Sequence, residues 1–174
     1  QVIDVAGYWI DQYEAHTPSK PITEEDDEAT AAAKKAFNMN QAGLLDTDRT
    51  WHDAKSICEQ QGKRLCSEDE WEKACKGPES HIYPYGDEFV DKQCPRSGYL
   101  PKYAYNEHVA CKSTHKVYNL GGGAMEWTSS KRGDNYIVKP GALGKDSQGT
   151  RCAGRFDRAP NFAQIHVGYR CCAD

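Results

Sequence analysis

Cysteine is the residue type whose number and spacing in this sequence could support the most chemistry. The 174 residues include eight cysteines, an even number, and none of them forms a CxxC pair of the kind found in zinc sites. A reduced cytosolic domain of this size usually carries far fewer, so the count favours disulfides. A redox-active role for one of the pairs is the alternative interpretation. Disulfides predict an oxidising compartment, and we therefore expect a secreted, periplasmic or cell-surface protein.

Histidine is the second residue type that could bind a metal here. No HxH or HxxxH spacing occurs among the six histidines, so a metal site would have to be assembled by the fold. Solvated or packed histidines are the interpretation that we favour. The six are His16, His52, His81, His108, His115 and His166.

Length, composition and charge limit the remaining possibilities. A chain of 174 residues with 38% hydrophobic residues predicts one domain, residues 1–174, with a moderately small core that gains from cross-links. There are 26 acidic and 22 basic side chains, giving a net charge of −4, and no Lys/Arg stripe, so we expect no nucleic-acid partner. The sequence contains no run of eighteen apolar residues, so it predicts no membrane span. The start at Gln1 suggests a processed or trimmed chain.

Two short helices have clear start signals. Thr50 with Asp53, and Ser67 with Glu70, fit the capping box, in which each residue satisfies a free backbone amide of the other. On each helix the apolar positions repeat at helical spacing and include one cysteine, Cys58 in the first and Cys75 in the second. We therefore expect both cysteines to point into the core. Gly62 follows the first helix, where glycine favours a left-handed cap.

Other segments give weaker patterns. Residues 7–13 (GYWIDQY) mix aromatic, β-branched and polar residues as a strand does. The segment TEEDDEATAAAKKAF predicts a surface helix capped by Thr23, with a solvated acidic loop as the alternative. Residues 77–116 show almost no periodicity and predict a long irregular region, which is unusual in a compact domain unless cross-links, a metal or a functional surface explain it. Short strand-like pieces follow in residues 138–172.

Five segments of the sequence, in the order in which they occur, resemble motifs of the formylglycine-generating-enzyme (sulfatase-modifying-factor) family. The segments are GKRLCSEDEWEKAC (62–75), YPYG (83–86), NLGGGAMEWT (119–128), RCAGR (151–155) and VGYRC (167–171). The resemblance begins at YWIDQYEAH near the N-terminus, and the GKRLC motif and terminal double cysteine are similar to a cysteine-rich branch. It implies an α+β, C-type-lectin-like fold with little regular secondary structure.

The resemblance also implies how the cysteines pair. In the family's secreted enzymes the cysteine of the first helix bonds to the terminal GFRC motif, and that of the second helix bonds to RCAAR. Carried over, these bridges are Cys58–Cys171 and Cys75–Cys152. On that assignment we expect Cys66–Cys172 and Cys94–Cys111 for the other four. A bond between the vicinal Cys171 and Cys172 would close a strained ring.

The family's enzymes oxidise a substrate cysteine with oxygen and a copper ion held by two thiolates. Those thiolates lie five residues apart, just before RCAAR, and soft thiolates suit Cu(I). The corresponding segment here, residues 139–150, contains no cysteine. The resemblance therefore implies that copper is not bound in this way and that no catalytic residue can be named. A related branch uses non-haem iron but belongs to longer chains with an added helical domain.

The resemblance implies one calcium site. The family binds calcium through an asparagine, two backbone carbonyls and a glutamate, and the matching positions are Asn119, Gly122, Ala124 and Glu126. Calcium takes six to eight oxygens, so the carbonyls are suitable ligands, and a glycine-rich turn before a strand is the alternative interpretation. For the family's second calcium site we find no matching residues, and we expect the Cys94–Cys111 bridge in its place.

Two functions remain open. The first is a non-catalytic binding or structural module, for which Tyr99, Tyr103 and Tyr105 form a candidate surface for a protein or glycan ligand. An amphipathic loop covering the core is the alternative for these tyrosines. The second is a divergent metal-dependent oxidoreductase whose ligands the fold gathers. Because a fold alone does not fix a function, the missing thiolates are the reason to favour the first.

Overall fold

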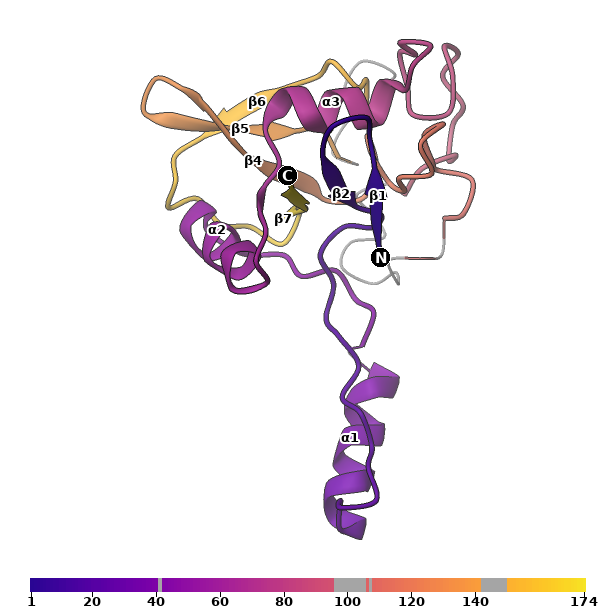
Figure 1. Ribbon diagram of the computed structural model, residues 1–174, viewed down its shortest axis with the longest axis vertical. Helices are drawn as coiled ribbons and strands as arrows, with labels where there is room; N and C mark the ends of the chain where they lie inside the picture. The colour runs from indigo at the N-terminus through magenta and orange to yellow at the C-terminus, as the bar shows by residue number, and fades with distance from the viewer. Residues whose placement is uncertain (41, 96–105, 107, 142–149) are drawn as a thin grey trace.

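A computed structural model describes the chain except for residues 41, 96–105, 107 and 142–149. A body containing all the strands carries an arm, residues 17–44, that stands away from it (Figure 1). No described helix is long and apolar enough to cross a membrane. The elements in chain order are β1 (Val2–Asp4), β2 (Trp9–Asp11), α1 (Glu28–Asn40), α2 (Trp51–Gln60), β3 (Arg64–Leu65), α3 (Glu68–Lys76), β4 (Met125–Arg132), β5 (Asn135–Lys139), β6 (Phe156–Arg158), β7 (Val167–Tyr169) and β8 (Cys171–Ala173).

Helices α2 and α3 begin where the capping boxes predict. Thr50 and Asp53 exchange side-chain and backbone hydrogen bonds at the start of α2, as Ser67 and Glu70 do at the start of α3. Gly62, at φ 68°, follows α2 in the left-handed region that glycine adopts at little cost. Cys58 and Cys75 are both fully buried, as the helical spacing predicts.

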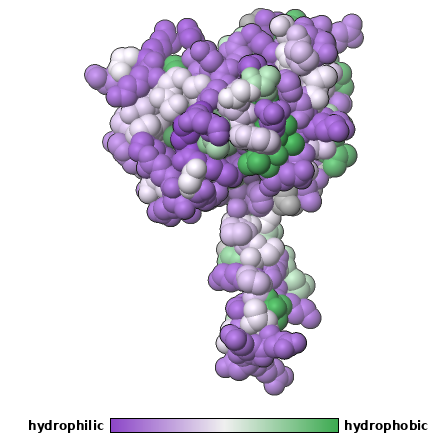
Figure 2. All heavy atoms as spheres, viewed as in Figure 1, coloured by the Kyte–Doolittle hydropathy of each residue, from purple (hydrophilic) through white to green (hydrophobic). Residues whose placement is uncertain are grey.

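Helix α1 forms the arm, and its predicted start at Thr23 is wrong. The helix begins at Glu28 because the side chain of Asp27 accepts a hydrogen bond from the backbone amide of Thr30, at 2.7 Å. Thr23 instead lies in a turn, where its amide donates to Asp26 at 2.8 Å. No residue of α1 is buried. The far end of the arm is hydrophilic on the face that Figure 2 shows.

The strands form two four-stranded sheets. The first has the order β1-β2-β8-β3, all antiparallel, and the second has the order β6-β5-β4-β7, with β4 and β7 parallel. Within the segment that predicts a strand over residues 7–13, only Trp9–Asp11 is paired as β2. The segment's first residue, Gly7 at φ 120°, belongs to the tight turn that joins β1 to β2.

Strand β8 lies between the two halves of the core. Side chains alternate along a strand, so Cys171 points into one buried cluster, with Trp127 and Tyr169, and Cys172 points into the other, with Ile10 and Trp71. The two adjacent cysteines therefore form two separate disulfides, one in each cluster.

Four disulfides account for all eight cysteines. They are the two pairs that the resemblance implies and the two expected for the remaining cysteines, and they close segments with sequence separations of 113, 106, 77 and 17 residues. The pairs are Cys58–Cys171, Cys66–Cys172, Cys75–Cys152 and Cys94–Cys111.

The described residues between α3 and β4 contain no helix or strand, as the sequence predicts. Short bridges, such as the one between Tyr83 and Gly86, are the regular pairing found there. This irregular region ends in the loop of residues 119–124, which leads directly into β4.

The size of each closed loop predicts how much each disulfide stabilises the fold. In the chain-entropy model, a loop of about 100 residues gives about 4 to 5 kcal/mol and one of about 15 residues gives about 3 kcal/mol. We expect the Cys58→Ala/Cys171→Ala variant to lose more unfolding free energy in urea titrations than the Cys94→Ala/Cys111→Ala variant. An equal or greater loss in the latter would contradict this view.

Candidate functional site

A buried polar cluster lies where the two sheets meet, and Arg170 is its centre. This arginine occupies the single position between β7 and β8 and is 1% exposed. Its guanidinium donates two hydrogen bonds to the carboxylate of Glu126 on β4, at 3.1 and 2.9 Å. It also donates to the backbone carbonyls of Asp11 (2.9 Å) and Tyr118 (2.8 Å). One side chain thus joins both sheets and the loop before β4.

Glu14 adds a second buried carboxylate to this cluster. It follows β2, is 2% exposed, and accepts hydrogen bonds from the backbone amide of Ala124 (2.8 Å) and the side-chain amide of Asn119 (3.1 Å). Burial, and secondly the charge of Glu126, raise the pKa of Glu14 to about 8, although Arg170 opposes the shift. Arg170 is ion-paired with Glu126, and its charge also acts on Glu14, so the cluster has one excess negative charge when all three groups are ionised.

All four residues of the predicted calcium set lie in or beside this cluster and are buried. Asn119 at φ 62°, Gly121 at φ 80° and Gly123 at φ 66° make the loop turn repeatedly in the left-handed region. Gly121 also has no room for a side chain, because a Cβ there would lie 2.5 Å from the carbonyl oxygen of Thr150. Glycine is therefore required at position 121 both by conformation and by space.

The donor set fits a calcium ion in residue type. Calcium prefers oxygen ligands, and the cluster becomes net negative, which favours a cation, when Glu14 ionises above about pH 8. Glu126 is the most crowded ligand, because Trp71 also donates to its carboxylate, at 2.7 Å. A carboxylate has about four acceptor positions, of which Arg170 and Trp71 use three, so a bound ion would share Glu126 with the guanidinium.

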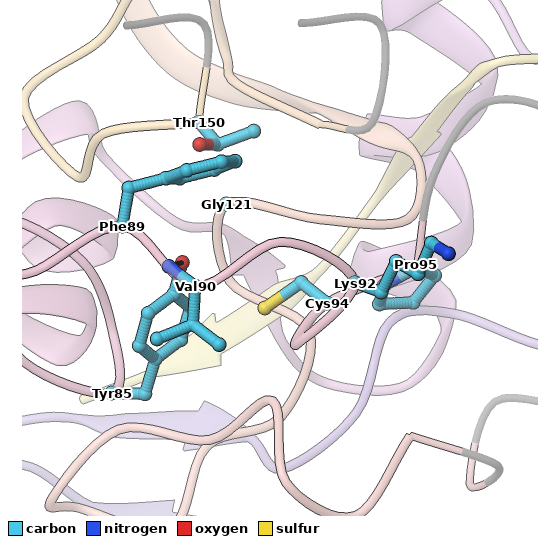
Figure 3. A pocket seen from close by; sticks show the side chains of 8 residues that line it. All are labelled: Tyr85, Phe89, Val90, Lys92, Cys94, Pro95, Gly121 and Thr150. Atoms are coloured by element: carbon cyan, nitrogen blue, oxygen red, sulfur yellow. Dashed lines mark hydrogen bonds between the residues drawn. The ribbon is translucent and has the colours of Figure 1, made fainter. Parts of the chain in front are cut away.

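A small pocket lies on the other side of the same loop (Figure 3). Gly121, Thr150 and the ring of Phe89 lie together on one side, and Tyr85 and Val90 lie on another. Cys94 supplies the pocket's sulfur atom, which is bonded to Cys111. Thr150 ends the segment in which the family carries its copper-binding thiolates, so this pocket borders that region of the fold.

The cysteines present do not fit a copper site of the family's kind. The segment of residues 139–150 has no cysteine, and every cysteine sulfur elsewhere is in a disulfide. Its first residue, Lys139, is fully buried, and its ammonium group lies 3.2 Å from Glu72 and 3.7 Å from Glu68. Burial lowers the pKa of Lys139 even though the acidic partners oppose the shift. This lysine anchors β5 on α3.

The histidines are dispersed. Within the described residues, which include all six histidines, no group of three or more His, Cys, Asp or Glu side chains is arranged to hold a metal. His52 packs edge-on against Trp51, and His81 contacts Asp87 at 3.2 Å. The candidate ligand surface of Tyr99, Tyr103 and Tyr105 lies outside the described residues.

Sequence reasoning missed Glu14 and Arg170 as members of the site. Both had a usable signal: Glu14 is an acid in the mainly aromatic and apolar segment YWIDQYEAH, and Arg170 interrupts the apolar segment VGYRCC. Buried charges are rare unless they are paired, so each could have predicted a partner. The actual partners are distant in sequence: Glu126 is 44 residues from Arg170, and Asn119 is 105 residues from Glu14.

Two solved structures have the same architecture as this chain. Treponema denticola variable protein 1 superimposes with a TM-score of 0.70 at 12% identity, over 95% of this chain and 84% of that one. PvdO from Pseudomonas aeruginosa gives 0.65 at 14% identity, over 96% and 80%. The fold is thus the C-type-lectin-like α+β fold that the motifs imply.

The sulfatase-modifying factor enzyme 1-like domain family matches residues 47–174, and the chain belongs to this family. The inactive C-alpha-formylglycine-generating enzyme 2 of Bos taurus is 28% identical over 145 residues, which cover 70% of this chain and 48% of that protein. The formylglycine-generating enzyme of Bos taurus is 25% identical over 167 residues, covering 72% and 42%. The chain thus spans about half the length of these relatives. The family match begins after Glu14, although the structure hydrogen-bonds Glu14 to Asn119 and Ala124 within the matched residues.

The raised pKa of Glu14 predicts a pH dependence. Because the folded state holds this proton more tightly than the unfolded state, with a pKa of about 8 against 4.5, its stabilising effect is complete below about pH 4.5 and is lost as the pH rises through about 8. The neutral Glu14→Gln side chain avoids this loss. We therefore compare the unfolding free energy of the Glu14→Gln variant with that of the unmodified protein, both in the presence of a chelator. We expect the variant's value minus that of the unmodified protein to rise between about pH 5 and pH 8.

Glu72→Gln is the matched control. Burial raises the pKa of Glu72, but contacts with Lys76 and Lys139 outweigh it and lower the pKa below 4.5. The difference between this variant and the unmodified protein should be constant from about pH 5 to pH 8. Parallel pH profiles for the two variants in urea titrations would contradict the assignment of Glu14.

Proposed function

We propose that this chain is a non-catalytic member of its family that acts as an extracytoplasmic binding or structural module. The observation that carries the proposal is the bonding of the eight cysteine sulfur atoms. All eight are in disulfides, and the segment that holds the catalytic thiolates in the family's enzymes has none. The framework of the fold is thus retained without the ligands that copper-dependent oxidation requires.

One relative supports the non-catalytic half of this proposal. The Bos taurus protein that is 28% identical to this chain is itself named as inactive. Members of this family therefore include at least one that is described as lacking the activity. The four disulfides support the extracytoplasmic location, because such bridges persist in oxidising compartments and are rare in a reducing cytosol.

The ligand that we propose for the module is a protein or a glycan. A scaffold tied by four cross-links loses little further conformational entropy when it binds, which favours recognition by loops that a rigid body presents. The long irregular region between α3 and β4 supplies such loops. Its segment with Tyr99, Tyr103 and Tyr105 stays a proposal for the contact surface.

An oxidation assay tests the absence of catalysis. The oxidised protein is incubated with a cysteine-containing peptide, oxygen, and copper or iron, and peptide mass and oxygen consumption are followed. The Bos taurus formylglycine-generating enzyme is the positive control. We expect no turnover above the metal alone. Multiple turnovers would contradict the proposal and favour a divergent metal-dependent oxidoreductase.

We also propose that the Asn119–Glu126 loop binds one structural calcium ion. The two buried carboxylates beside one guanidinium support a cation there, because the ionised cluster carries one uncompensated negative charge; the left-handed backbone of the loop supports it as well. The chain's own part is to fix the loop: Glu14 accepts from Asn119 and Ala124, and Arg170 orients Glu126. Calcium would supply charge compensation and an additional tie between the loop and β4.

Calcium titration of chelator-treated protein tests this site. A ligand that binds only the folded state adds about 2.7 kcal/mol at 100 times its Kd, so we expect calcium to raise the Tm of the unmodified protein. Asn119→Ala should lose the shift, whereas Glu59→Gln, which changes an exposed acid on α2, should keep it. If titration calorimetry of the unmodified protein gives no binding heat, the loop is a glycine-rich turn without an ion.

A further inference from the structure

One of the four disulfides differs from the others in exposure. All eight cysteines are in the described part of the chain, and seven of them have at most 1% of their surface exposed. Cys94 is the exception, because it is only partly buried. An external thiolate must reach a sulfur atom to exchange with a disulfide. The Cys94–Cys111 bridge is therefore the one that a reductant can approach without unfolding the protein.

The same bridge contributes least to global stability. It closes a separation of 17 residues, against 77 to 113 for the other three, and loop-closure entropy rises with loop length. Neither Cys94 nor Cys111 belongs to the two buried clusters that contain the other six cysteines. Opening this bridge therefore leaves both clusters cross-linked.

The surroundings of Cys94 also suit thiol exchange. Its side chain lines the pocket of Figure 3, where the sulfur is directed towards Val90 and Tyr85. Lys92, a cation, lines the same pocket. Val90 is 46% exposed, so an apolar surface adjoins the site of attack.

The geometry points to Cys94 as a thiol-exchange site, at which a low-mass thiol or a dithiol protein opens the Cys94–Cys111 bridge while the fold persists. The incoming thiolate attacks Sγ of Cys94 and forms a mixed disulfide, and the bond to Cys111 breaks with the electron pair leaving on the Cys111 sulfur, which takes up a proton. A second thiol then displaces Cys94. The product is two protein thiols and one external disulfide, so two electrons come from the two external thiols.

Opening the bridge would loosen the two supports of the loop before β4. The backbone amide of Asn119 donates to the carbonyl of Cys111 at 2.8 Å, and the amide of Gly123 donates to the carbonyl of Pro95 at 3.0 Å. A Cβ on Gly122 would lie 2.4 Å from that of Cys94. The bridge thus joins the two chain segments that hold this loop. The exchange reaction itself rests on accessibility, whether or not the loop binds calcium.

Graded reduction of the native protein tests the exchange site directly. Samples are equilibrated with increasing dithiothreitol, alkylated, and mapped by peptide mass spectrometry, with far-UV circular dichroism as the measure of folding. We expect Cys94 and Cys111 to be alkylated at dithiothreitol concentrations at least tenfold lower than the other six cysteines, before the spectrum changes. Opening of another bridge first, or of all four together with unfolding, would overturn the inference.

Two single variants test which sulfur is attacked. Cys111→Ser leaves Cys94 as the free thiol, and Cys94→Ser leaves Cys111. With oxidised glutathione as the probe, we expect Cys111→Ser to form the mixed disulfide at least tenfold faster. Equal rates in two variants that retain the native circular dichroism spectrum would show that Cys94 is not the site of attack. Should either variant fail to fold, the graded reduction of the unmodified protein still decides whether this bridge opens first.

Discussion

The fold depends on the cross-linking of one short strand, β8, to both halves of the core. Its two adjacent cysteines point to opposite sides. Cys171 is therefore bonded to Cys58 on α2, and Cys172 to Cys66, which lies just before α3. A chain with many two- and three-residue strands has few ladder hydrogen bonds to hold it together. Disulfides that join residues about a hundred positions apart supply the stability that so little regular structure cannot provide.

The buried polar cluster has the corresponding role at the centre of the molecule. Arg170, immediately before β8, reaches Glu126 on β4 and two backbone carbonyls of neighbouring segments. Breaking a buried ion pair is costly, whereas an intact one often adds little net stability. Its contribution is therefore to position the loop of residues 119–124, which lies between the cluster and the pocket that borders the family's copper region.

Local signals in the sequence predicted the local structure well. The capping boxes at Thr50 and Ser67 set the helix starts because both partners lie within three residues. The Thr23 start failed because Asp27, also a good cap, lies closer to the first helical turn. The Tyr99, Tyr103 and Tyr105 surface stays a prediction. The partners of Glu14 and Arg170 could not be identified from sequence alone, since these contacts depend on how β2, β4 and β8 are arranged.

Every cysteine sulfur in this protein is bonded to another cysteine sulfur, which leaves no thiolate to hold a redox ion. Alkylation of the native protein, purified without reductant and analysed by intact-mass spectrometry with and without copper(I), measures this directly. The account predicts no alkylated cysteine and no bound copper. A pair of free thiols in the oxidised, folded protein that becomes protected from alkylation when copper(I) is added would contradict it.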